Sequence, residues 1–403
     1  MANGTYDIIT VGGGMGGSAL AFAMADRGAR VLVLERERQF RDRVRGEFLA
    51  SWGVAELRAL GLYALLRDSC GHELPWIDQG LRPGHLERRD LVATTPMSAP
   101  VLSFYHPRMQ EVLLAAATHA GAEVCRGASV HEVRPGVRPT VVVEQDGHNE
   151  EICARLVVGA DGRTAMTRGW GGFATEQDPP PGVLTVGVLF EEMWGIPDDA
   201  SYVLFNPSLG QSVPVFPQGQ GRVRAYFCYH SQAPYRLQGE RDVPRLIEES
   251  VRTGTPAAFF QGARAVGPLA TFEGADRWVP HPYRMGVALI GDAAASTEPT
   301  FGQGMSLTLR DARVLRDHLL SQEDWHMAGQ AYAEDHDRYY GAVRTVQHWF
   351  KQLFFAPGPE TEARQDSVVP LLIQDATRIP DVLFSGPEVP VDETVRRRFF
   401  GEE

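Results

Sequence analysis

Short apolar runs and small residues alternate along the first part of the chain. Residues 7–11 form a mainly apolar run followed by glycines, residues 18–27 are rich in alanine, and residues 29–34 are mainly apolar again. This order predicts a βαβ unit with two parallel buried strands and a helix that ends at Gly28. Glu35 follows the second strand, where such units place an acid on the ribose of a bound adenosine.

Two kinds of periodicity are visible further along the chain. Apolar positions at the i, i+3 and i+4 spacing predict helices over residues 54–67, 109–120, 307–320 and 327–355. Alternating or continuous apolar runs predict strands over residues 137–143, 156–158 and 285–290 and within 183–229. Asp146 and Gly147 follow the first of these strands and are typical of a hairpin turn. Both helices and sheets are therefore expected.

The length of the chain and one proline-rich segment indicate more than one domain. A chain of 403 residues exceeds the size of a single typical core, and residues 171–182 contain three consecutive prolines typical of a linker. We expect an α/β fold in which a Rossmann-type domain is interrupted by a mostly antiparallel β-sheet domain and followed by C-terminal helices. The expected bounds are residues 1–70, 101–170 and 280–330 for the Rossmann-type domain, 71–100 and 171–279 for the sheet domain, and 331–403 for the helical extension.

Composition and charge exclude several classes of protein. The chain has 39 basic and 51 acidic residues, and its net charge of −12 disfavours nucleic acid or an anionic membrane as a partner. The four cysteines are scattered, so we expect neither a metal site nor a disulfide framework. The N-terminus lacks the features of a signal peptide, and no apolar run is long enough to span a membrane. We expect a cytoplasmic protein; its oligomeric state, a homo-oligomer included, is left open by the sequence.

A G-x-G-x-x-G motif lies between the first predicted strand and its helix. It consists of Gly12, Gly14 and Gly17, with Met15 inside it. Glycines allow a pyrophosphate to approach the backbone, and the helix N-terminus offers unpaired N–H groups and the positive end of the helix dipole. Because Glu35 follows about 20 residues later, this context is typical of a dinucleotide site rather than of a plain βα turn.

Two further motifs place a glycine beside an aspartate at the end of a predicted strand. Asp161 and Gly162 follow the strand over 156–158, although this pair alone is equally typical of an ordinary turn. Gly291 and Asp292 follow the strand over 285–290, and a loop then leads into a helix. Candidate residues in that loop and at the helix start are Pro299, Phe301, Gly302, Gly304 and Met305. A dinucleotide that contacts all three motifs requires a domain that is discontinuous in sequence.

In order and spacing these motifs resemble those of the FAD-dependent monooxygenases of the para-hydroxybenzoate hydroxylase type, over about residues 5–330. The resemblance implies that the first motif holds the FAD pyrophosphate, that Glu35 holds the adenosine ribose, and that Asp161 contacts both FAD and incoming NADPH. It also implies that Asp292 binds the ribityl or pyrophosphate region and that residues 299–305 lie against the isoalloxazine ring.

The resemblance also implies an arginine contact before the first long helix and a flavin contact at the start of the next. Arg45 is the better phosphate candidate, with Arg43 as its alternative, and either His106 or Arg108 is expected to contact the flavin. The implied cofactor contacts are Gly12, Gly14, Met15, Gly17, Glu35, Arg36, Arg45, His106, Arg108, Asp161, Gly162, Gly291, Asp292, Gly302, Gly304 and Met305.

Several residues depart from the usual pattern of that family. Ala165, Ala295, Phe301 and Ser306 stand where Ser, His, Gly and Asn are usual, yet no carboxylate and no pyrophosphate-facing glycine is lost. FAD binding is therefore still expected. The phenyl ring at position 301 is expected to reshape the substrate space, so Pro299 and Phe301 are candidates for residues near the reaction centre.

The aromatic strands of the sheet domain supply candidate substrate contacts. These are Tyr202, Tyr226, Tyr229 and His230, in addition to Phe301. For any one of the strand residues, packing in the core of the sheet is the commoner role. Which of them face the flavin depends on strand register, and the sequence does not determine the register.

The resemblance implies an enzyme in which the flavin performs the chemistry. NAD(P)H would reduce FAD, O₂ would add at C4a, and the resulting hydroperoxide would transfer a hydroxyl group to an aromatic or polyketide-like small molecule. The protein would supply positioning and a dry pocket, so no side-chain base is strictly needed. The substrate, the regiochemistry and the choice between NADH and NADPH remain open at this point.

Three other functions are compatible with parts of the sequence. A related flavoprotein could reduce or epoxidise an isoprenoid double bond, and a flavin-fold protein could escort an intermediate without turnover. Residues 192–197 (EMWGIP) match a halogenase signature except at its first tryptophan. Halogenases also need a lysine in the active site, and the only lysine of this chain, Lys351, is far in sequence from the flavin motifs. A halogenase is therefore disfavoured.

Overall fold

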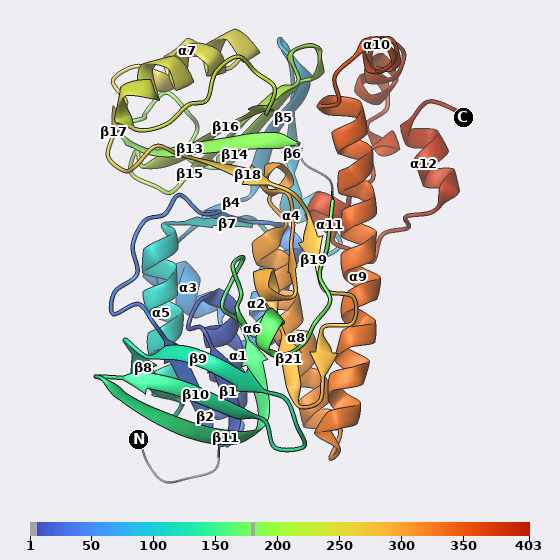
Figure 1. Cartoon of the computed structure of the whole chain (residues 1–403). Coiled ribbons are helices and arrows are strands. Elements are labelled where there is room, and N and C mark those ends of the chain that lie inside the picture. Colours follow the sequence, from blue (N-terminus) through green and yellow to red (C-terminus); the bar gives the residue numbers. More distant parts are fainter. Residues whose placement is uncertain (1–5, 179–181) are drawn as a thin grey trace.

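The molecule has two lobes, and one long helix runs along both of them (Figure 1). The computed structural model describes residues 6–178 and 182–403. The prolines at 179–181, which mark the expected linker, lie outside the described residues. The lower lobe in Figure 1 contains the N-terminal strand, the upper lobe contains a second large sheet, and α9 (Trp325–Phe354) passes alongside both.

Parallel strands form the centre of the lower lobe. The order of its sheet is β20 (Tyr283–Arg284), β21 (Val287–Leu289), β11 (His148–Gly159), β1 (Tyr6–Val11), β2 (Val31–Glu35) and β8 (Glu123–Arg126). β1 pairs in parallel with both β2 and β11, and β11 pairs in parallel with β21. With α1 (Met15–Ala25) between β1 and β2, the expected βαβ unit is confirmed.

The register of this sheet aligns the ends of its central strands. Val11 at the end of β1 lies opposite Leu34 of β2 and Gly159 of β11, and Gly159 lies opposite Leu289 of β21. Because the carboxyl ends of parallel strands share one edge, the three glycine motifs emerge side by side. Strand pairing thus brings together segments that are far apart in the sequence.

Helices cover one face of the parallel sheet and a hairpin covers the other. α1 packs between α5 (His106–His119) and α8 (Gly304–Ser321), and α8 packs against α9. On the opposite face, β9 (Ser129–Arg134) and β10 (Thr140–Gln145) form an antiparallel layer with the first half of β11. That layer shares a core of buried apolar side chains with β1 and β2.

The upper lobe is built on a second sheet, which is mostly antiparallel. The order of this sheet is β17 (Arg264–Ala265), β13 (Val183–Glu191), β16 (Val223–His230), β15 (Gln211–Pro217), β14 (Ala200–Asn206), β5 (Trp76–Arg82) and β6 (His85–Asp90). β18 (Ala270–Gly274) also pairs with β13, and β14 and β5 are parallel. α7 (Val243–Thr253) packs on the outer face of the sheet, over its own apolar core.

Small sheets and short helices lie between or beside the large sheets. The small sheets are formed by β3 (Phe48–Leu49), β7 (Val101–Phe104) and β4 (Gly71–Leu74), and by β12 (Glu176–Gln177), β19 (Arg277–Trp278) and β22 (Ala295–Ser296). Two short helices are α4 (Leu91–Thr94) and α6 (Thr167–Trp170). The first small sheet lies directly below the upper sheet in Figure 1, at the junction of the lobes.

Two of the expected elements differ from the observed ones. The helix expected over 54–67 is divided into α2 (Ser51–Leu60) and α3 (Tyr63–Ser69), because Gly61 ends α2 in the left-handed conformation with φ of 77°. The strand expected over 137–143 is shifted and forms β10, and Asp146 and Gly147 make the turn to β11 as expected. Apolar spacing alone did not reveal the helix break.

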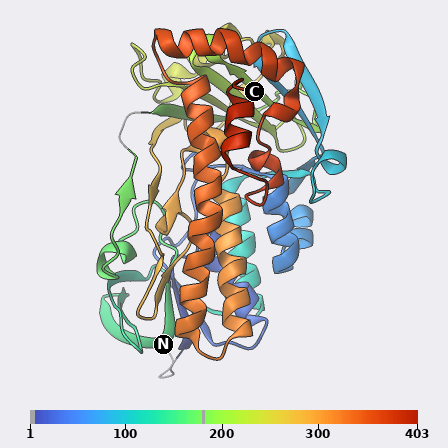
Figure 2. The same ribbon diagram turned by 90° about the vertical axis from the view of Figure 1, so that its right-hand side faces the viewer.

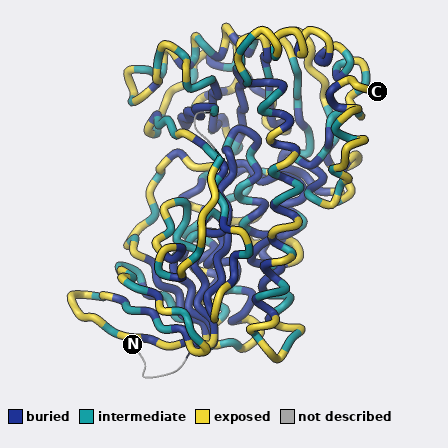
Figure 3. Tube along the Cα trace, turned by 45° about the vertical axis from the view of Figure 1, so that its right-hand side comes forward, coloured by how far each residue is buried: buried dark blue, intermediate teal, exposed yellow. Residues whose placement is uncertain are grey.

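The C-terminal part folds back along the molecule after α9. α10 (Pro359–Gln374), α11 (Val382–Ser385) and α12 (Glu393–Phe399) lie beside the upper lobe, as Figure 2 shows. Buried segments run through the centre of both lobes in Figure 3, and exposed segments lie at the periphery. Within 6–178 and 182–403, we find no helix with the length and apolar character needed to cross a membrane.

Candidate active site

The three glycine motifs border one elongated cavity between the lobes. Its larger part has a volume of about 450 Å³ and is lined by residues of all three motifs and by the inner face of the upper sheet. A smaller part of about 280 Å³ extends along the end of β2. The two parts share lining residues, among them Gly14, Arg45 and Gly162. Together they form one site that runs from the edge of the parallel sheet to the upper lobe.

The glycines of the first motif have two different roles. A Cβ atom at Gly12 would lie 2.4 Å from the Ala160 carbonyl oxygen, and one at Gly17 would lie 2.0 Å from the Gly12 carbonyl oxygen. These two glycines allow α1 to pack closely on the strand ends. At Gly14 a Cβ atom would meet only the Gln110 side chain at 3.7 Å, so this position faces open space in the cavity.

The first turn of α1 is free to bind an anion. Gly14 is the N-cap of α1 and provides no side-chain capping bond, and Met15 at the first helical position lines the cavity. The backbone N–H groups of a first helical turn have no partner inside the helix, and the helix dipole is positive at this end. A phosphate group fits both conditions.

Glu35 is held rigidly at the end of β2. Its Oε2 atom accepts a hydrogen bond from the Gly13 backbone N–H at 2.8 Å, and its Oε1 atom accepts one from the Glu37 backbone N–H at 2.7 Å. The carboxylate and the neighbouring Arg36 line the smaller part of the cavity. Since each carboxylate oxygen has further acceptor capacity, Glu35 can also receive ribose hydroxyl groups.

Two aspartates provide acceptors that the protein leaves partly or wholly unused. Asp161 accepts a bond from the Thr167 backbone N–H through Oδ2 at 3.1 Å, whereas its buried Oδ1 has no partner. Asp292 makes no hydrogen bond within the described part of the chain, and burial raises its pKa while three arginines, Arg45, Arg163 and Arg168, oppose that rise. Both aspartates lie at the cavity, so their unused acceptor atoms are available to the hydroxyl groups of a bound ligand.

The start of α8 repeats the arrangement found at α1. Gln303, its N-cap, provides no side-chain capping bond to the helix, and Gly304 and Met305 line the cavity. A Cβ atom at Gly304 would lie 3.8 Å from Asp292 Oδ1, so the Asp292 carboxylate is beside this helix end. Free N–H groups, an unpartnered carboxylate and a glycine-lined space fit the phosphates and hydroxyl groups of FAD.

The structure separates the two candidates at the start of α5. His106 lines the cavity; its backbone N–H donates to Glu47 Oε1 at 2.9 Å, and its Nδ1 atom pairs with the Gly46 carbonyl at 2.8 Å. Burial lowers the pKa of His106 to about 4, so its imidazole is neutral at pH 7. Because Nδ1 must then donate to the carbonyl, Nε2 is left as an acceptor.

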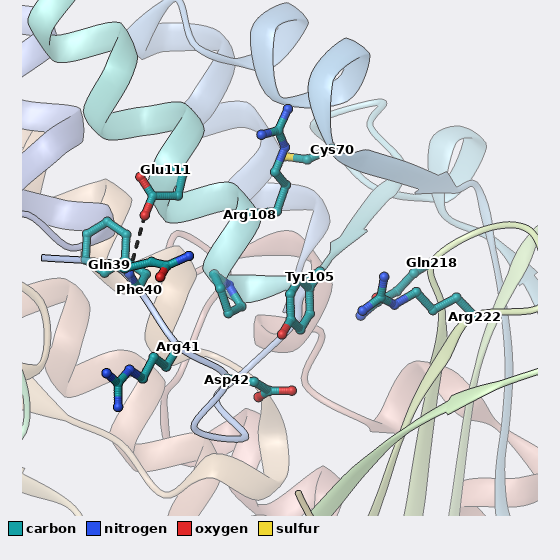
Figure 4. A pocket seen from close by; sticks show the side chains of 11 residues that line it. Gln39, Phe40, Arg41, Asp42, Cys70, Tyr105, Arg108, Glu111, Gln218 and Arg222 are labelled. Atoms are coloured by element: carbon teal, nitrogen blue, oxygen red, sulfur yellow. Dashed lines mark hydrogen bonds between the residues drawn. The ribbon is translucent and has the colours of Figure 1, made fainter. Parts of the chain in front are cut away.

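Arg108 lies at a different pocket, outside the cavity. That pocket has a volume of about 550 Å³ and also contains Arg41, Tyr105 and Arg222 (Figure 4). The Arg222 guanidinium lies 4.5 Å from the centre of the Tyr105 ring. Position 108 is on the outer side of the α5 N-terminus, whereas position 106 is on the inner side, so the two side chains cannot occupy the same site.

A buried ionic cluster that the sequence reasoning missed positions the Arg43–Glu47 segment. Arg224 of β16 donates from Nε to Glu47 Oε2 at 2.8 Å and from Nη2 to Asp42 Oδ2 at 2.8 Å. Tyr226 donates from its hydroxyl group to the Arg45 carbonyl at 2.6 Å. These bonds leave the Arg43 and Arg45 side chains lining both parts of the cavity. The signals in the sequence were two acids, Asp42 and Glu47, in an otherwise basic segment and an arginine, Arg224, inside an apolar strand.

Strand alternation decides which aromatic residues face the cavity. Tyr226 on β16 lines it, whereas Tyr202 on β14 points to the outer face and packs against Phe259 at 5.1 Å between ring centres. Tyr229 belongs to the same outer core, and its hydroxyl group accepts from the Leu237 backbone N–H. His230, at the end of β16, is half-buried and does not line the cavity. Tyr202 and Tyr229 are therefore not at the site, because side chains alternate between faces along a strand. His230 has the same parity as Tyr226 and Cys228, but it lies at the last position of β16, beyond the residues that line the cavity.

The loop before α8 forms one wall of the cavity. Pro299 and Phe301 both line it, and the Phe301 ring is buried against Phe205 of β14 and Phe350 of α9, with ring centres 6.2 and 5.5 Å apart. Phe301 thus joins the wall formed by the upper sheet. Gly302 lies at the same wall and adopts the left-handed conformation with φ of 68°.

The side of the cavity that faces the upper sheet is apolar. It is lined by Phe48, Ile77, Val203, Phe205, Pro214, Phe216, Phe272, Phe301, Leu383 and Phe384. The polar side chains on this side of the cavity carry no charge at pH 7. They include Gln79, Thr185, Tyr226, Cys228 and Thr300. Charged side chains line only the side formed by the glycine motifs and the Arg43–Glu47 segment. The cavity therefore has a polar end and an apolar end.

Comparison with known proteins identifies the family to which these motifs belong. A family model described as the FAD binding domain matches residues 5–348. A rifampicin monooxygenase of Streptomyces venezuelae is 28% identical over 89% of this chain and 74% of its own length. A menaquinone reductase of Mycolicibacterium smegmatis is 28% identical over 79% of this chain and 77% of its own length.

Solved structures share the fold at low sequence identity. The crystal structure of a p-nitrophenol 4-monooxygenase from Pseudomonas putida matches with a TM-score of 0.77 and 20% identity, over 96% of this chain and 99% of that one. A flavin-dependent brominase matches with a TM-score of 0.75 and 16% identity, over 99% of each chain. At these identities the likeness concerns the fold alone, which is the α/β architecture expected from the sequence.

Lys351 and Trp194, the two residues considered for a halogenase site, lie away from the cavity. Lys351 on α9 donates to Asp276 Oδ2 at 2.8 Å and lies 3.4 Å from Asp178 Oδ2. Neither Lys351 nor Trp194 lines the cavity, and Trp194 of the WGIP stretch is 69% exposed. Lys351 is thus engaged in an ionic cluster rather than presented to a substrate.

Proposed function

This chain belongs to the FAD binding domain family and is an enzyme of the FAD-dependent monooxygenase class, and we propose that it hydroxylates an uncharged aromatic or polyketide-like small molecule with NAD(P)H and O₂. The observation that supports this proposal is the division of the cavity. Its polar end fits the cofactor, and its apolar end has neutral lining residues only. A charged substrate would lose its hydration there without a partner, which is costly.

Residues at the polar end hold the cofactor in this proposal. The N-termini of α1 and α8 bind its phosphates, Glu35 binds the ribose of its adenosine, and Asp161 and Asp292 accept bonds from its hydroxyl groups. Arg45 and neutral His106 complete the contacts at the junction of the lobes. When bound and reduced by NAD(P)H, FAD supplies the activation of O₂ for transfer to the substrate.

Residues at the apolar end orient the substrate and exclude water. Phe205, Phe216 and Phe301 provide flat apolar surfaces. The Gln79 amide can donate to a neutral carbonyl or hydroxyl group, whereas the Thr300 hydroxyl, which donates to Glu298, can accept from a hydroxyl group. Excluding water from this space strengthens polar interactions and protects reactive species from side reactions. No acid or base of the chain is needed at the apolar end, consistent with its neutral lining.

Oxygen-isotope labelling tests the proposal directly. The purified protein should contain one FAD, and uncharged phenols should accelerate NAD(P)H oxidation, whereas carboxylated phenols should not. When the reaction is run under ¹⁸O₂, the product should contain one ¹⁸O atom that the substrate lacks. If uncharged aromatic compounds neither perturb the flavin absorbance nor accelerate NAD(P)H oxidation, the proposed substrate class is wrong.

The same experiment separates two alternative functions. A reductase is the second candidate, because a menaquinone reductase is among the relatives and the apolar lining of the cavity suits an isoprenoid chain that carries the double bond. Such an enzyme would work without O₂ and would add two hydrogen atoms to its substrate. A flavin-fold escort protein would bind the compound without stimulated NAD(P)H oxidation.

A further inference from the structure

Residues near the C-terminus reach the cavity although they lie outside the part of the chain matched by the family model. That match ends at residue 348, whereas Leu383 and Phe384 of α11 line the cavity. α11 lies near the junction of the lobes, beside α9 (Figure 1). A part of the cavity wall is therefore built by a segment that the family pattern does not specify.

The wall formed by α11 is joined to the loop that precedes α8. The Leu383 carbonyl accepts a hydrogen bond from Gln303 Nε2 at 3.3 Å, and Gln303 Oε1 accepts one from Trp52 Nε1 at 2.9 Å. The Phe384 ring packs edge-on against Phe48, with ring centres 6.3 Å apart. α11 is thus connected to α2, to β3 and to the loop that precedes α8.

An ion pair fixes α11 to the upper sheet. Arg89 at β6 donates from Nη1 and Nη2 to the two carboxylate oxygens of Asp381, at 2.7 and 2.8 Å. The Arg89 guanidinium also lies 5.5 Å from the centre of the Phe384 ring. Bidentate pairs of this kind constrain geometry more strongly than single ion pairs do. Asp381 is the N-cap of α11, so the pair positions the whole helix.

The side chains of α11 differ in exposure, and this difference indicates that Leu383 lines the cavity. Val382 and Ser385 are completely or almost completely buried, at 0% and 3% exposure, and pack into the protein. Leu383 between them stays partly accessible, and it is one of the residues that line the cavity. An apolar side chain that remains accessible inside a cavity is available for contact with an apolar ligand.

We propose that Leu383 and Phe384 are specificity-determining residues, which set the length of the apolar substituent that a neutral aromatic substrate can carry, and that the Arg89–Asp381 pair positions them. This proposal rests on the proposed function. The aromatic ring of the substrate lies near Phe301, and its substituent extends toward α11. Members of the family that differ in this C-terminal segment would then differ in substrate while retaining the same cofactor site.

The first experiment measures the binding of 4-alkylphenols of increasing chain length and of their methyl ethers. Dissociation constants come from changes in the flavin absorbance of the FAD-loaded enzyme without reductant, so turnover is not required. Leu383→Ala should shift the preferred chain length upward by one or two methylene groups, and Leu383→Trp should shift it downward. Since one buried methylene is worth about 0.8 kcal/mol, each step changes relative affinity roughly fourfold.

A matched control is available on the neighbouring helix. Leu371 on α10 is also half-buried but does not line the cavity, so Leu371→Ala should keep the chain-length preference of the parent enzyme. FAD content and the absorbance spectrum of each variant report whether the cofactor site is intact. An unchanged preference in both Leu383 variants, with normal FAD content, would overturn the proposal.

The second experiment tests the positioning role of the ion pair. Asp381→Asn and Arg89→Gln should each weaken discrimination between short and long alkylphenols by at least threefold while FAD content stays normal. The double variant should resemble the single ones, because both remove the same interaction. Asp375→Asn, which affects a more exposed pair with Arg398, serves as the control. Equal discrimination in the Asp381 variant and the control would show that the pair does not position α11.

The two proposals fail in distinguishable ways. If the alkylphenols bind with the expected shift in preference but are not hydroxylated, the wall is correctly assigned and the proposed reaction is wrong. If they are hydroxylated with the same preference in all variants, the reaction is correct and α11 does not select the substrate. If none of them binds to the parent enzyme, both proposals are wrong.

Discussion

Arg224 on β16 is completely buried and binds Glu47, which is also completely buried, across 2.8 Å between Nε and Oε2. The two residues belong to different lobes of the chain. Glu47 also receives the backbone N–H of His106, so the pair ties the inner sheet face to the start of α5. A polar contact at the junction of the lobes thus sets the position of residues at the cofactor end of the cavity.

Breaking this pair should destabilise the fold strongly. Arg224→Gln leaves the Glu47 carboxylate buried without a countercharge, and the loss of one partner of a buried ion pair typically costs about 3–5 kcal/mol. The free energy of unfolding from chemical denaturation measures the effect. Arg396→Gln, which affects solvent-screened pairs with Glu393 and Glu402, should destabilise the protein far less. Equal losses in the two variants would contradict the role assigned to the buried pair.

Gly14→Val should abolish FAD binding without unfolding the protein. The Cβ position at Gly14 points into the cavity and meets only Gln110, so a valine side chain fits the folded chain. The same side chain would occupy the space that the pyrophosphate of FAD needs. Circular dichroism should report a native fold, and the protein should be colourless. Gly341→Val on α9 also has nothing within 4 Å of its Cβ position and should retain FAD. Stoichiometric FAD in the Gly14 variant would refute the assignment.

Asp292→Ala should weaken FAD binding at least tenfold. Hydrogen bonds to a charged group contribute roughly 1.5–3 kcal/mol each, and this carboxylate has no other partner in the described chain. Titration of the apoprotein with FAD, followed by flavin fluorescence, gives the dissociation constant. Asp198→Ala, at an exposed position away from the cavity, serves as the control. If the FAD dissociation constants of the Asp292 and Asp198 variants are equal, the role assigned to Asp292 is wrong.

Glu298 should make stability fall as the pH rises from about 4.5 to 7. Burial, together with the nearby Asp276 carboxylate, raises the pKa of Glu298 to about 7, although bonds from Thr300 and the charge of Lys351 oppose the rise. In the unfolded chain this group ionises near pH 4.5. The folded form therefore binds the proton more tightly, and its contribution to stability is lost between about pH 4.5 and 7.

Glu298→Gln tests this pH dependence. The variant should be insensitive to the ionisation, so the difference in unfolding free energy between the variant and the parent should grow in favour of the variant as the pH rises from 4.5 to 8. The change should amount to as much as about 3 kcal/mol, because each pKa unit corresponds to about 1.4 kcal/mol. A difference that is constant over this range would show that Glu298 does not titrate there.

Local patterns in the sequence were sufficient for the cofactor side of the site. The G-x-G-x-x-G motif, the position of Glu35 and the two Gly–Asp pairs each depend on a few neighbouring residues and on strand ends. The structure places all of these segments around one cavity. Local patterns were weaker for the choice between His106 and Arg108, because helix phase at an N-terminus depends on where the first turn begins.

The sequence by itself determined the βαβ unit, the family of the cofactor domain and the sheet character of the second lobe, since glycine turns and side-chain periodicity are local properties. Only the tertiary structure decided that Tyr226 faces the cavity and Tyr202 does not, that Arg224 binds Glu47, and that α11 completes the wall. These features depend on register and on contacts between residues at least 80 positions apart. No pattern within a single segment encodes such contacts, because each one forms only after folding has brought two distant segments together.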